Sequence, residues 1–342
     1  MTEFKAFPSI EQFRHVIQKV TNSTRYVGKD EETQKPIYDY NKELPTIEFI
    51  GIIKIHGTNF CIGFNPVDNE FWFQSRNNII TPIKDNLGSA RFAYDRLDCF
   101  KDIVSKIENP NNENIWIYGE FAGKGIQDGV SVSEVEKFFT IFKIKVGNIW
   151  LSNDFINGLD SYTEHRIFNS LFFGHKTIQI DFNKPELSQN KLIEMTLEIE
   201  QECPVGKAFG ISGIGEGLVF SAVGSEYNSS EYWFKSKGEK HSVTKVKKLV
   251  EVDVEKIENI SKFVDSVLTE NRMLQGFQYL IESNKELSEK STGDFIRWCH
   301  NDIVKEETDR MIVSNITEKD LGKHIPNIAR KWFFNKLNEW KQ

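Results

Sequence analysis

The stretch Ile47-Glu48-Phe49-Ile50-Gly51-Ile52-Ile53-Lys54-Ile55-His56-Gly57-Thr58-Asn59-Phe60 decides the fold, because it joins two strand-like runs through a short turn. Lys54 stands near the end of the first run, among isoleucines. Burial disfavours an ammonium ion, so we expect a lowered pKa for Lys54 and a neutral amine that can attack an electrophile. Gly57 permits a tight turn and close approach by a ligand. Taken alone, such a lysine is more often a strand-end residue that reaches for solvent.

Further short runs of β-branched and aromatic residues predict a series of antiparallel strands. Helical patterns lie between some of them, at Ser89–Ile107 and Asn190–Glu202. Strands and helices do not alternate regularly, so we predict an α+β fold and not a doubly wound sheet. The predicted strands are Ile47–Ile55, Phe60–Phe64, Glu70–Gln74, Ile115–Phe121, Phe138–Val146, Leu218–Ala222 and Glu231–Lys237.

The two ends of the chain differ from this central pattern. Residues 1–28 predict a helix that Ser9-Ile10-Glu11-Gln12 can cap, and the polar residues 29–46 predict an exposed loop. After about Val250 the chain is rich in Glu, Lys and Leu at helical spacing. We therefore predict two domains, residues 1–243 and an all-helical domain of residues 244–342, joined by a lysine-rich segment at residues 238–249.

The composition fits a globular protein, with 342 residues, 39% hydrophobic and 27% charged. A net charge of −7 argues against a protein that coats nucleic acid indiscriminately, although Lys235–Lys248 carries a local concentration of lysines. No apolar run approaches the roughly 18 residues of a membrane span, and Met1–Lys5 lacks a secretory-signal layout. Four scattered cysteines predict reduced thiols. We expect a cytoplasmic monomer with no membrane partner.

Five charged residues stand beside or within apolar strand-like runs: Arg76, Glu120, Glu216, Lys235 and Lys237. Glu120 interrupts the apolar run Ile115–Phe121. Lys235 and Lys237 are two residues apart, so on a strand their side chains share one face. Each of these residues alone is as often structural or solvated as functional. Together with Lys54, however, they follow one another in an order that carries information.

That order is Lys-x-x-Gly, Arg, Gly-Glu-Phe, Glu-Gly and Lys-x-Lys, and it resembles the covalent nucleotidyltransferases, which include polynucleotide ligases and mRNA capping enzymes. The runs Lys54–Phe60, Gly119–Gln127 and Phe139–Phe142 are similar to the bacteriophage RNA ligase 2 family. The C-terminal runs Thr269–Arg272 and Asp302–Arg310 resemble the helical domain of that family. The resemblance implies an antiparallel-sheet, ATP-grasp-like nucleotidyltransferase domain followed by a small helical domain.

The resemblance also implies a reaction in three steps. A lysine attacks ATP and forms lysyl-AMP, AMP passes to an RNA 5′-phosphate, and a 3′-hydroxyl displaces AMP to seal the break. Lys54 would be the nucleophile, Lys235 and Lys237 would neutralise the α-phosphate, and Glu216 would bind Mg²⁺ or Mn²⁺. The residues implied to contact the nucleotide are Ile53, Lys54, Ile55, Asn59, Arg76, Glu120, Phe142, Glu216, Lys235 and Lys237.

The implied substrate is RNA, as a nicked duplex or as ends bridged by another strand, as in RNA repair. Residues implied to meet the RNA end are His56, Thr58, Arg272, Asp302 and Glu306. Asp302 and Glu306 are four apart and would share a helix face, although a salt-bridged surface helix explains them nearly as well. Two alternatives remain open: an mRNA capping guanylyltransferase that uses GTP, and a catalytically silent protein that binds RNA ends or nucleotides.

Two positions depart from the family pattern. Lys143 follows Phe142 where the family commonly has an acid, and Ser221 stands where it commonly has a lysine. The two changes are opposite in charge. We therefore hypothesise that the basic group of the nucleotide pocket has moved from one strand to the other.

Overall fold

The structure is a computed structural model that describes residues 2–32, 34–39, 41–238 and 256–340. The chain forms two compact units, Met1–Gly238 and Glu239–Gln342, and each is described here by itself. The predicted boundary at residues 243/244 and most of the lysine-rich segment lie outside the described residues. That domain boundary therefore stays a prediction.

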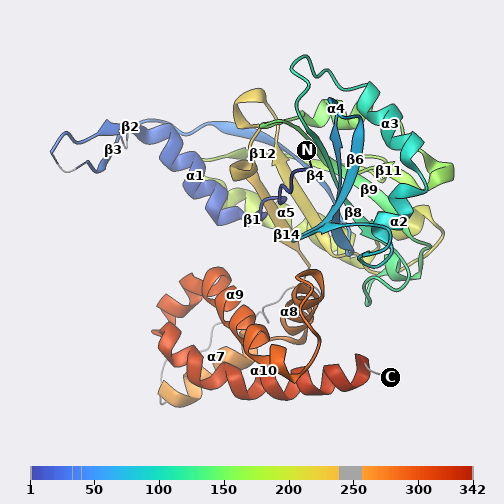
Figure 1. The fold of residues 1–342 in the computed structure, drawn as a ribbon. Helices are drawn as coiled ribbons and strands as arrows, with labels where there is room; N and C mark the ends of the chain where they lie inside the picture. Colours follow the sequence, from blue (N-terminus) through green and yellow to red (C-terminus); the bar gives the residue numbers. More distant parts are fainter. Residues whose placement is uncertain (1, 33, 40, 239–255, 341–342) are drawn as a thin grey trace. The chain divides into compact units, whose positions relative to one another are not determined.

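The first unit contains two larger sheets and a hairpin (Figure 1). The seven-stranded sheet consists of β5 (Thr58–Asn65), β6 (Glu70–Ser75), β7 (Ile79–Ile80), β8 (Ile115–Ala122), β9 (Phe138–Val146), β10 (Ile149–Trp150) and β11 (Ile167–Asn169). The five-stranded sheet has the order β1 (Glu11–Gln12), β14 (Trp233–Lys237), β13 (Gly217–Ala222), β4 (Thr46–Lys54) and β12 (His175–Asp181). The β1–β14 and β11–β9 pairs are parallel, and the other pairs in these two sheets are antiparallel.

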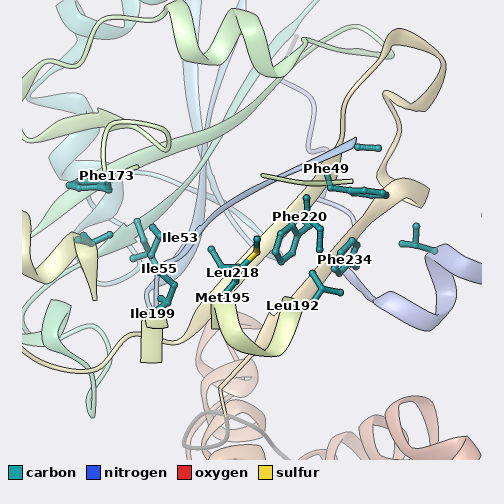
Figure 2. Close-up of a cluster of buried hydrophobic side chains, with 14 of the residues drawn as sticks. Phe49, Ile53, Ile55, Phe173, Leu192, Met195, Ile199, Leu218, Phe220 and Phe234 are labelled. Carbon is teal, nitrogen blue, oxygen red and sulfur yellow. The ribbon is translucent and has the colours of Figure 1, made fainter. Parts of the chain in front are cut away.

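Each sheet packs one face against its own helices. Alternate residues of β4, such as Phe49 and Ile53, join a core with side chains of α1 (Phe13–Arg25), α5 (Gln189–Gln201) and α6 (Pro204–Ala208). Figure 2 shows this core, where Met195 and Ile199 of α5 lie near Leu218 of β13. The seven-stranded sheet packs against α2 (Ser89–Tyr94), α3 (Leu97–Ser105) and α4 (Asn153–Gly158).

The other faces of the two sheets meet in an aromatic cluster. Trp150 of the seven-stranded sheet and Trp233 of the five-stranded sheet have ring centroids 5.0 Å apart. Phe7, from the N-terminal segment, stacks on Trp233 at 5.5 Å and contacts Tyr118 of β8 at 5.2 Å. The strand alternation therefore sends apolar side chains outward to the helices and a mixed set of aromatic and charged side chains between the sheets.

The second unit is helical where it is described. Its helices are α7 (Lys256–Val267), α8 (Glu270–Glu282), α9 (Thr292–Val313) and α10 (Glu318–Trp340). Phe277, Phe295 and Phe333 are central to its apolar core. The prediction of an α+β fold with a helical C-terminal region is confirmed in this general form. No helix among the described residues is long and apolar enough to cross a membrane.

Several local predictions were wrong. The strands β2 (Tyr26–Lys29) and β3 (Pro36–Tyr38) form a hairpin. All of β3 falls within residues 29–46, which were predicted to be a loop. Gln12 precedes α1 without a side-chain cap, because Glu11–Gln12 pairs with β14. The predicted helix Ser89–Ile107 is divided into α2 and α3 between Tyr94 and Leu97.

Several strands were not predicted, and the longest of them is β12. β12 runs antiparallel to β4 along the edge of the five-stranded sheet. Only Ile178 and Ile180 of its residues are buried. Because most of its side chains are exposed and polar, its sequence gives a weak strand signal.

Candidate active site

The Lys54–Asn59 segment crosses from one sheet to the other. Lys54 is the last residue of β4 in the five-stranded sheet, and Thr58 is the first residue of β5 in the seven-stranded sheet. The three residues between them form the connection. This geometry places Lys54 where the inner faces of the two sheets can both contribute side chains.

Gly57 fits this connection because its backbone lies against β8. Its N–H donates a hydrogen bond to Glu120 Oε1 at 3.1 Å. A Cβ atom on Gly57 would stand 2.4 Å from the carbonyl oxygen of Phe121, which is closer than real Cβ contacts. Glycine is therefore required by packing of the chain against itself, in addition to any ligand that approaches the turn.

Three basic side chains converge on Glu216, and we call these four residues the Glu216 cluster. Lys54 Nζ is 2.7 Å from Glu216 Oε2, and Lys237 Nζ is 3.0 Å from Glu216 Oε1. His56 Nδ1 lies 3.4 Å from Oε2. The strand register explains the convergence, because Gly217 pairs with Lys54 of β4 on one side and Lys237 of β14 on the other. The carboxylate is thus held against the predicted nucleophile.

The pKa of Lys54 changes in the direction opposite to the one expected from burial alone. Burial lowers it, but the charges of Glu216 and Glu120 outweigh burial, and the pKa is raised. For Glu216, burial acts to raise the pKa, yet the charges of Lys237 and Lys54 hold it well below its usual range. The expectation of a neutral Lys54 amine was therefore wrong for this arrangement. Lys54 is an ammonium ion whose charge is neutralised by a buried carboxylate.

A second set of predicted residues lies on the inner face of the seven-stranded sheet. In the strand register Asn59 of β5 stands opposite Glu120 of β8, and Glu120 stands opposite Thr140 of β9. Phe142 lies farther along β9, half-buried, with its ring 4.9 Å from that of Phe7. The structure thus places Asn59, Glu120 and Phe142 on one face of adjacent strands, as a nucleotide pocket requires.

A β-bulge in β9 interrupts the alternation of side chains between Ile141 and Lys143. Tyr118 pairs with Lys143, whereas the following Gly119 pairs with Ile141, so Phe142 is the extra residue of β9. Bulged residues break the simple alternation of side chains. Ile141 and Ile144 consequently both face the helix-side core, while Lys143 reaches to 5.1 Å from the Trp233 ring on the opposite sheet.

Lys143 and Ser221 are linked through a residue that sequence reasoning missed. Lys143 Nζ donates to Asn153 Oδ1, and Asn153 Nδ2 donates to Ser221 Oγ at 3.0 Å. Burial lowers the pKa of Lys143 to about 8. Ser152 caps the N-terminus of α4 by accepting from Phe155 N, a capping pattern that could have located the helix. No sequence signal shows that Asn153 would face Lys143.

The remaining predicted residues of this unit have different settings. The side chains of Ile53 and Ile55 lie in the apolar core of Figure 2, so only their backbone faces the nucleotide side. That Ile53 and Ile55 contact a nucleotide stays a prediction, and such a contact would use their backbone. Arg76 is exposed just after β6, near enough for its charge to lower the pKa of Lys54. Thr58 is buried and accepts a hydrogen bond from Asn86 Nδ2 at 3.4 Å.

Lys235 sits in β14 two residues before Lys237 and is half-buried. In the strand register it stands opposite Val219 of β13. Alternation along β14 gives it the same face as Lys237 and Trp233. The spacing predicted that the two lysines share one face of a strand, and the structure shows that this is the inner face of the sheet.

In the helical unit, Arg272 is buried and does not present its guanidinium to solvent. Its Nε is 2.8 Å from Asp302 Oδ2, and its Nη2 is 3.1 Å from Glu307 Oε1. We call Arg272, Asp302 and Glu307 the Arg272 cluster. Glu307 occupies the place that the helix-face argument gave to Glu306. In this arrangement Arg272 positions Asp302, and its own side chain has no exposed area.

The site has too few side chains of the kinds that bind metals to hold a metal ion by themselves. Among residues 2–32, 34–39, 41–238 and 256–340, no group of three or more His, Cys, Asp or Glu side chains could do so. Both oxygens of Glu216 already accept from lysines. Mg²⁺ commonly binds one or two carboxylates together with substrate phosphates and water. The residues therefore fit a divalent ion that arrives with a nucleotide whose phosphates supply further ligands.

Comparison with solved structures gives distant matches. A variant of Naegleria gruberi RNA ligase with ATP and Mn, and another with AMP and Mn, each have a TM-score of 0.44 and 13% identity. The same enzyme with PPi has a TM-score of 0.43 and 14% identity. Each match covers 70% of this chain but only 58% of the other, so this chain spans less than two thirds of their length.

Comparison with curated protein sequences finds no match. A family model described as RNA ligase matches residues 47–237. The matched region contains Lys54, Glu120, Glu216 and Lys237, and it covers more than half of the 342 residues. The chain therefore belongs to the RNA ligase family.

Proposed function

We propose that this protein is an ATP-dependent RNA ligase that forms a covalent lysyl-AMP on Lys54. The observation that carries the proposal is the Glu216 cluster. It places a lysine amine, a carboxylate and a second lysine within 3.0 Å contacts at the crossing between two sheets. The similarity to the RNA ligase 2 subgroup, the use of RNA and the sealing of nicks all belong to the proposal.

The first step is a displacement at the α-phosphorus of ATP. Lys54 Nζ forms a bond to phosphorus, the bond to the bridging oxygen breaks, and pyrophosphate leaves. Because Lys54 starts as an ammonium ion, it gives up one proton to become the attacking amine and a second as the bond to phosphorus forms. Both protons pass to solvent or to the leaving pyrophosphate, while Glu216 holds the amine by a hydrogen bond of 2.7 Å. Lys237 and Lys235 meet the negative charge that develops on the phosphate. A divalent ion bound with the nucleotide, through Glu216, would act as a Lewis acid.

The next two steps move AMP and close the break. An oxygen of the RNA 5′-phosphate attacks the phosphorus of lysyl-AMP, and the bond to Lys54 breaks. A 3′-hydroxyl then attacks the 5′ phosphorus, and AMP leaves as the phosphodiester forms. In-line displacements of this kind depend on positioning and charge more than on covalent help from the protein. Glu120, Asn59 and Phe142 would hold the nucleoside throughout, on the inner face of the seven-stranded sheet.

The first experiment incubates the protein with Mg²⁺ or Mn²⁺ and ATP labelled on the α-phosphate. Wild type should retain label through denaturation, and Lys54→Ala should retain none. Lys176→Ala is the matched control, because Lys176 also forms an ion pair with a glutamate but lies on the edge strand β12. If wild type and Lys54→Ala are equally unlabelled, the proposal fails.

Two further assays separate the alternatives. Labelled GTP should give much less adduct than ATP; the reverse result would identify a capping guanylyltransferase. The adenylylated protein is then given duplex RNA with a single nick. Sealed RNA is expected, whereas a stable adduct that never transfers AMP to RNA would exclude ligation. A catalytically silent binding protein would form no adduct at all.

A further inference from the structure

A cavity in the helical unit has a lining suited to a nucleotide. It lies between α8 and α9, beside the segment that joins these two helices, and its volume is about 400 Å³. It is lined by Tyr279, Lys285, Asp294, Arg297, Trp298, Asn301, Asp302 and Lys305. Six of these residues lie on α9, and each has another of the six three or four positions away, so they form one continuous face of that helix. Volumes of this order are typical of small-ligand sites.

Two aromatic rings form one side of the cavity. Tyr279 of α8 and Trp298 of α9 are stacked, with ring centroids 6.1 Å apart and planes at 29°. Trp298 packs closely on α8, because a Cβ on Gly276 would lie 2.7 Å from its ring. Tyr279 is 36% exposed, and Trp298 is only half-buried. Aromatic rings that keep part of their surface exposed in this way can stack an unpaired nucleobase.

Cations surround these rings. Lys285 and Arg297 are each 3.2 Å from a carboxylate oxygen of Asp294, which holds both side chains at the wall. Lys305 is exposed one turn beyond Asp302. The negative charge of Asp302 is met by the buried Arg272. The lining thus carries three cations, Lys285, Arg297 and Lys305, against the two carboxylates of Asp294 and Asp302, although the whole chain has a net charge of −7.

We propose that this cavity binds one unpaired nucleotide of an RNA strand. Tyr279 and Trp298 stack its base, and Lys285, Arg297 and Lys305 neutralise the phosphates on either side. A base inside a duplex cannot reach the rings, so the nucleotide is one that is already unstacked or that frays at a strand end. That the strand is RNA rests on the proposed function. The ligand class, a base with its phosphates, rests on the cavity.

The experiment measures binding of a labelled, 5′-phosphorylated single-stranded RNA to the full chain. Trp298→Leu keeps apolar bulk but removes the ring, and Tyr279→Leu does the same on α8. Loss of one base stack should weaken binding by roughly five- to a hundredfold. Trp340→Leu is the control, because Trp340 packs on Phe277 of α8 but does not line the cavity. Lys305→Gln should weaken binding and reduce its salt dependence, whereas Lys319→Gln on α10 should not.

An RNA series with one abasic position tests the stacking independently of protein stability. For wild type, one abasic position should weaken binding as much as Trp298→Leu does, and combining the two should cost little more. Equal affinity of wild type, both leucine variants and all abasic RNAs would overturn the proposal. The proposal would also be overturned if Lys305→Gln weakened RNA binding but no abasic position did, because the cavity would then contact phosphates and not a base.

Failure of this inference and failure of the proposed function are distinguishable. Lysyl-AMP formation needs no RNA, so Trp298→Leu should label with ATP as wild type does. If wild type forms lysyl-AMP but the RNA affinities do not respond to the cavity variants, the cavity proposal fails and the ligase proposal stands. If wild type forms no adduct but the cavity variants and abasic RNAs behave as described, the ligase proposal fails and the cavity proposal stands.

Discussion

The two units each contain a buried charge held by opposite charges, and the two clusters are built in opposite senses. In the Glu216 cluster the buried centre is a carboxylate, 2% exposed, and its lysine partners are more exposed, Lys54 at 23% and Lys237 at 17%. In the Arg272 cluster the centre is a guanidinium with no exposed area. One of its partners, Glu307, is also buried.

The difference concerns which group can meet a ligand. Lysines are flexible point charges, and a buried lysine changes its protonation state readily. The Glu216 cluster therefore fixes its carboxylate and leaves two amines at the surface of the site. Arg272 forms a planar, multiply hydrogen-bonded centre that also donates to the backbone carbonyl of Val267. It joins the end of α7, the start of α8 and the middle of α9. The Glu216 cluster leaves groups that can react with a ligand, whereas the Arg272 cluster holds three helices together.

Removing the Arg272 centre should have the largest effect on stability. Arg272→Met leaves Asp302 and the buried Glu307 without the cation between them, and breaking a buried ion pair in this way costs about 3–5 kcal/mol. Glu307 keeps its ion pair with Arg310 at 3.1 Å, so we expect a loss at the lower end of this range. We expect the helical unit to unfold at a lower temperature, measured by calorimetry or by hydrogen exchange of α8 and α9. Lysyl-AMP formation by the first unit should persist. A stable Arg272→Met variant that seals poorly would contradict the architectural role.

The Glu216 cluster should respond in the opposite way. Lys237→Ala removes one donor from the proposed phosphate site, and losses of that kind slow a reaction by about 10²–10³, or roughly 3–4 kcal/mol. Stability should change by less than about 1 kcal/mol, because Lys54 still neutralises Glu216. Single-turnover labelling with ATP measures the rate, and thermal unfolding measures the stability. If Lys237→Ala labels at the wild-type rate but unfolds at a lower temperature, the prediction is contradicted, because the Glu216 cluster would then be structural like the Arg272 cluster.

Lys143 provides a third case, a buried cation whose hydrogen-bond acceptor is an amide. Its pKa is lowered from 10.5 to about 8, so between these values the unfolded chain binds the proton more tightly than the native protein. Stability should therefore rise with pH across this window, by up to about 3 kcal/mol from this residue. Chemical denaturation of wild type and Lys143→Met between pH 7.5 and about 10 isolates the contribution. A constant difference between the two proteins would contradict it.

The smallest expected effect tests whether the basic group has moved between strands. Asn153 links Lys143 to Ser221, which shows that the two positions face each other. Lys143→Asp and Ser221→Lys should each impair labelling with ATP. The double variant should recover part of the loss, with a coupling energy of about 1–2 kcal/mol. Simple addition of the two defects would reject the hypothesis. Asn183→Leu is a structural control, since the Asn183 side chain bonds the backbone of Leu44 and the carboxylate of Asp181 and takes no part in this bridge.

Much of the sheet could be predicted because its strands are short runs rich in β-branched and aromatic residues, which favour extended structure. The predicted Phe138–Val146 agrees with β9 residue for residue. The bulge at Phe142 could not be predicted, because the extra residue is defined only by its neighbour β8. The division between α2 and α3 was likewise hidden, since both segments carry apolar residues at helical spacing.

The candidate site was predictable where local sequence defines chemistry. The Lys54–Asn59 segment, the acidic residues and the Lys-x-Lys pair are short patterns that can be read directly. Their order along the chain supports membership of the RNA ligase family, which residues 47–237 match. The direction of the Lys54 pKa was not predictable, because it depends on Glu216 and Glu120 and not on the isoleucines beside it.

The sequence by itself thus determined the types of reactive group, the α+β class and a helical C-terminal region. Only the tertiary structure decided which groups meet. Glu216 contacts Lys54 across 162 residues because β13 lies beside β4 in one particular register. A shift of one residue in a strand turns every side chain to the opposite face. Glu307 rather than Glu306 meets Arg272 for the same kind of reason, since the rotation of a packed helix selects its inward residues. Long-range packing fixes both choices, and no local pattern contains them.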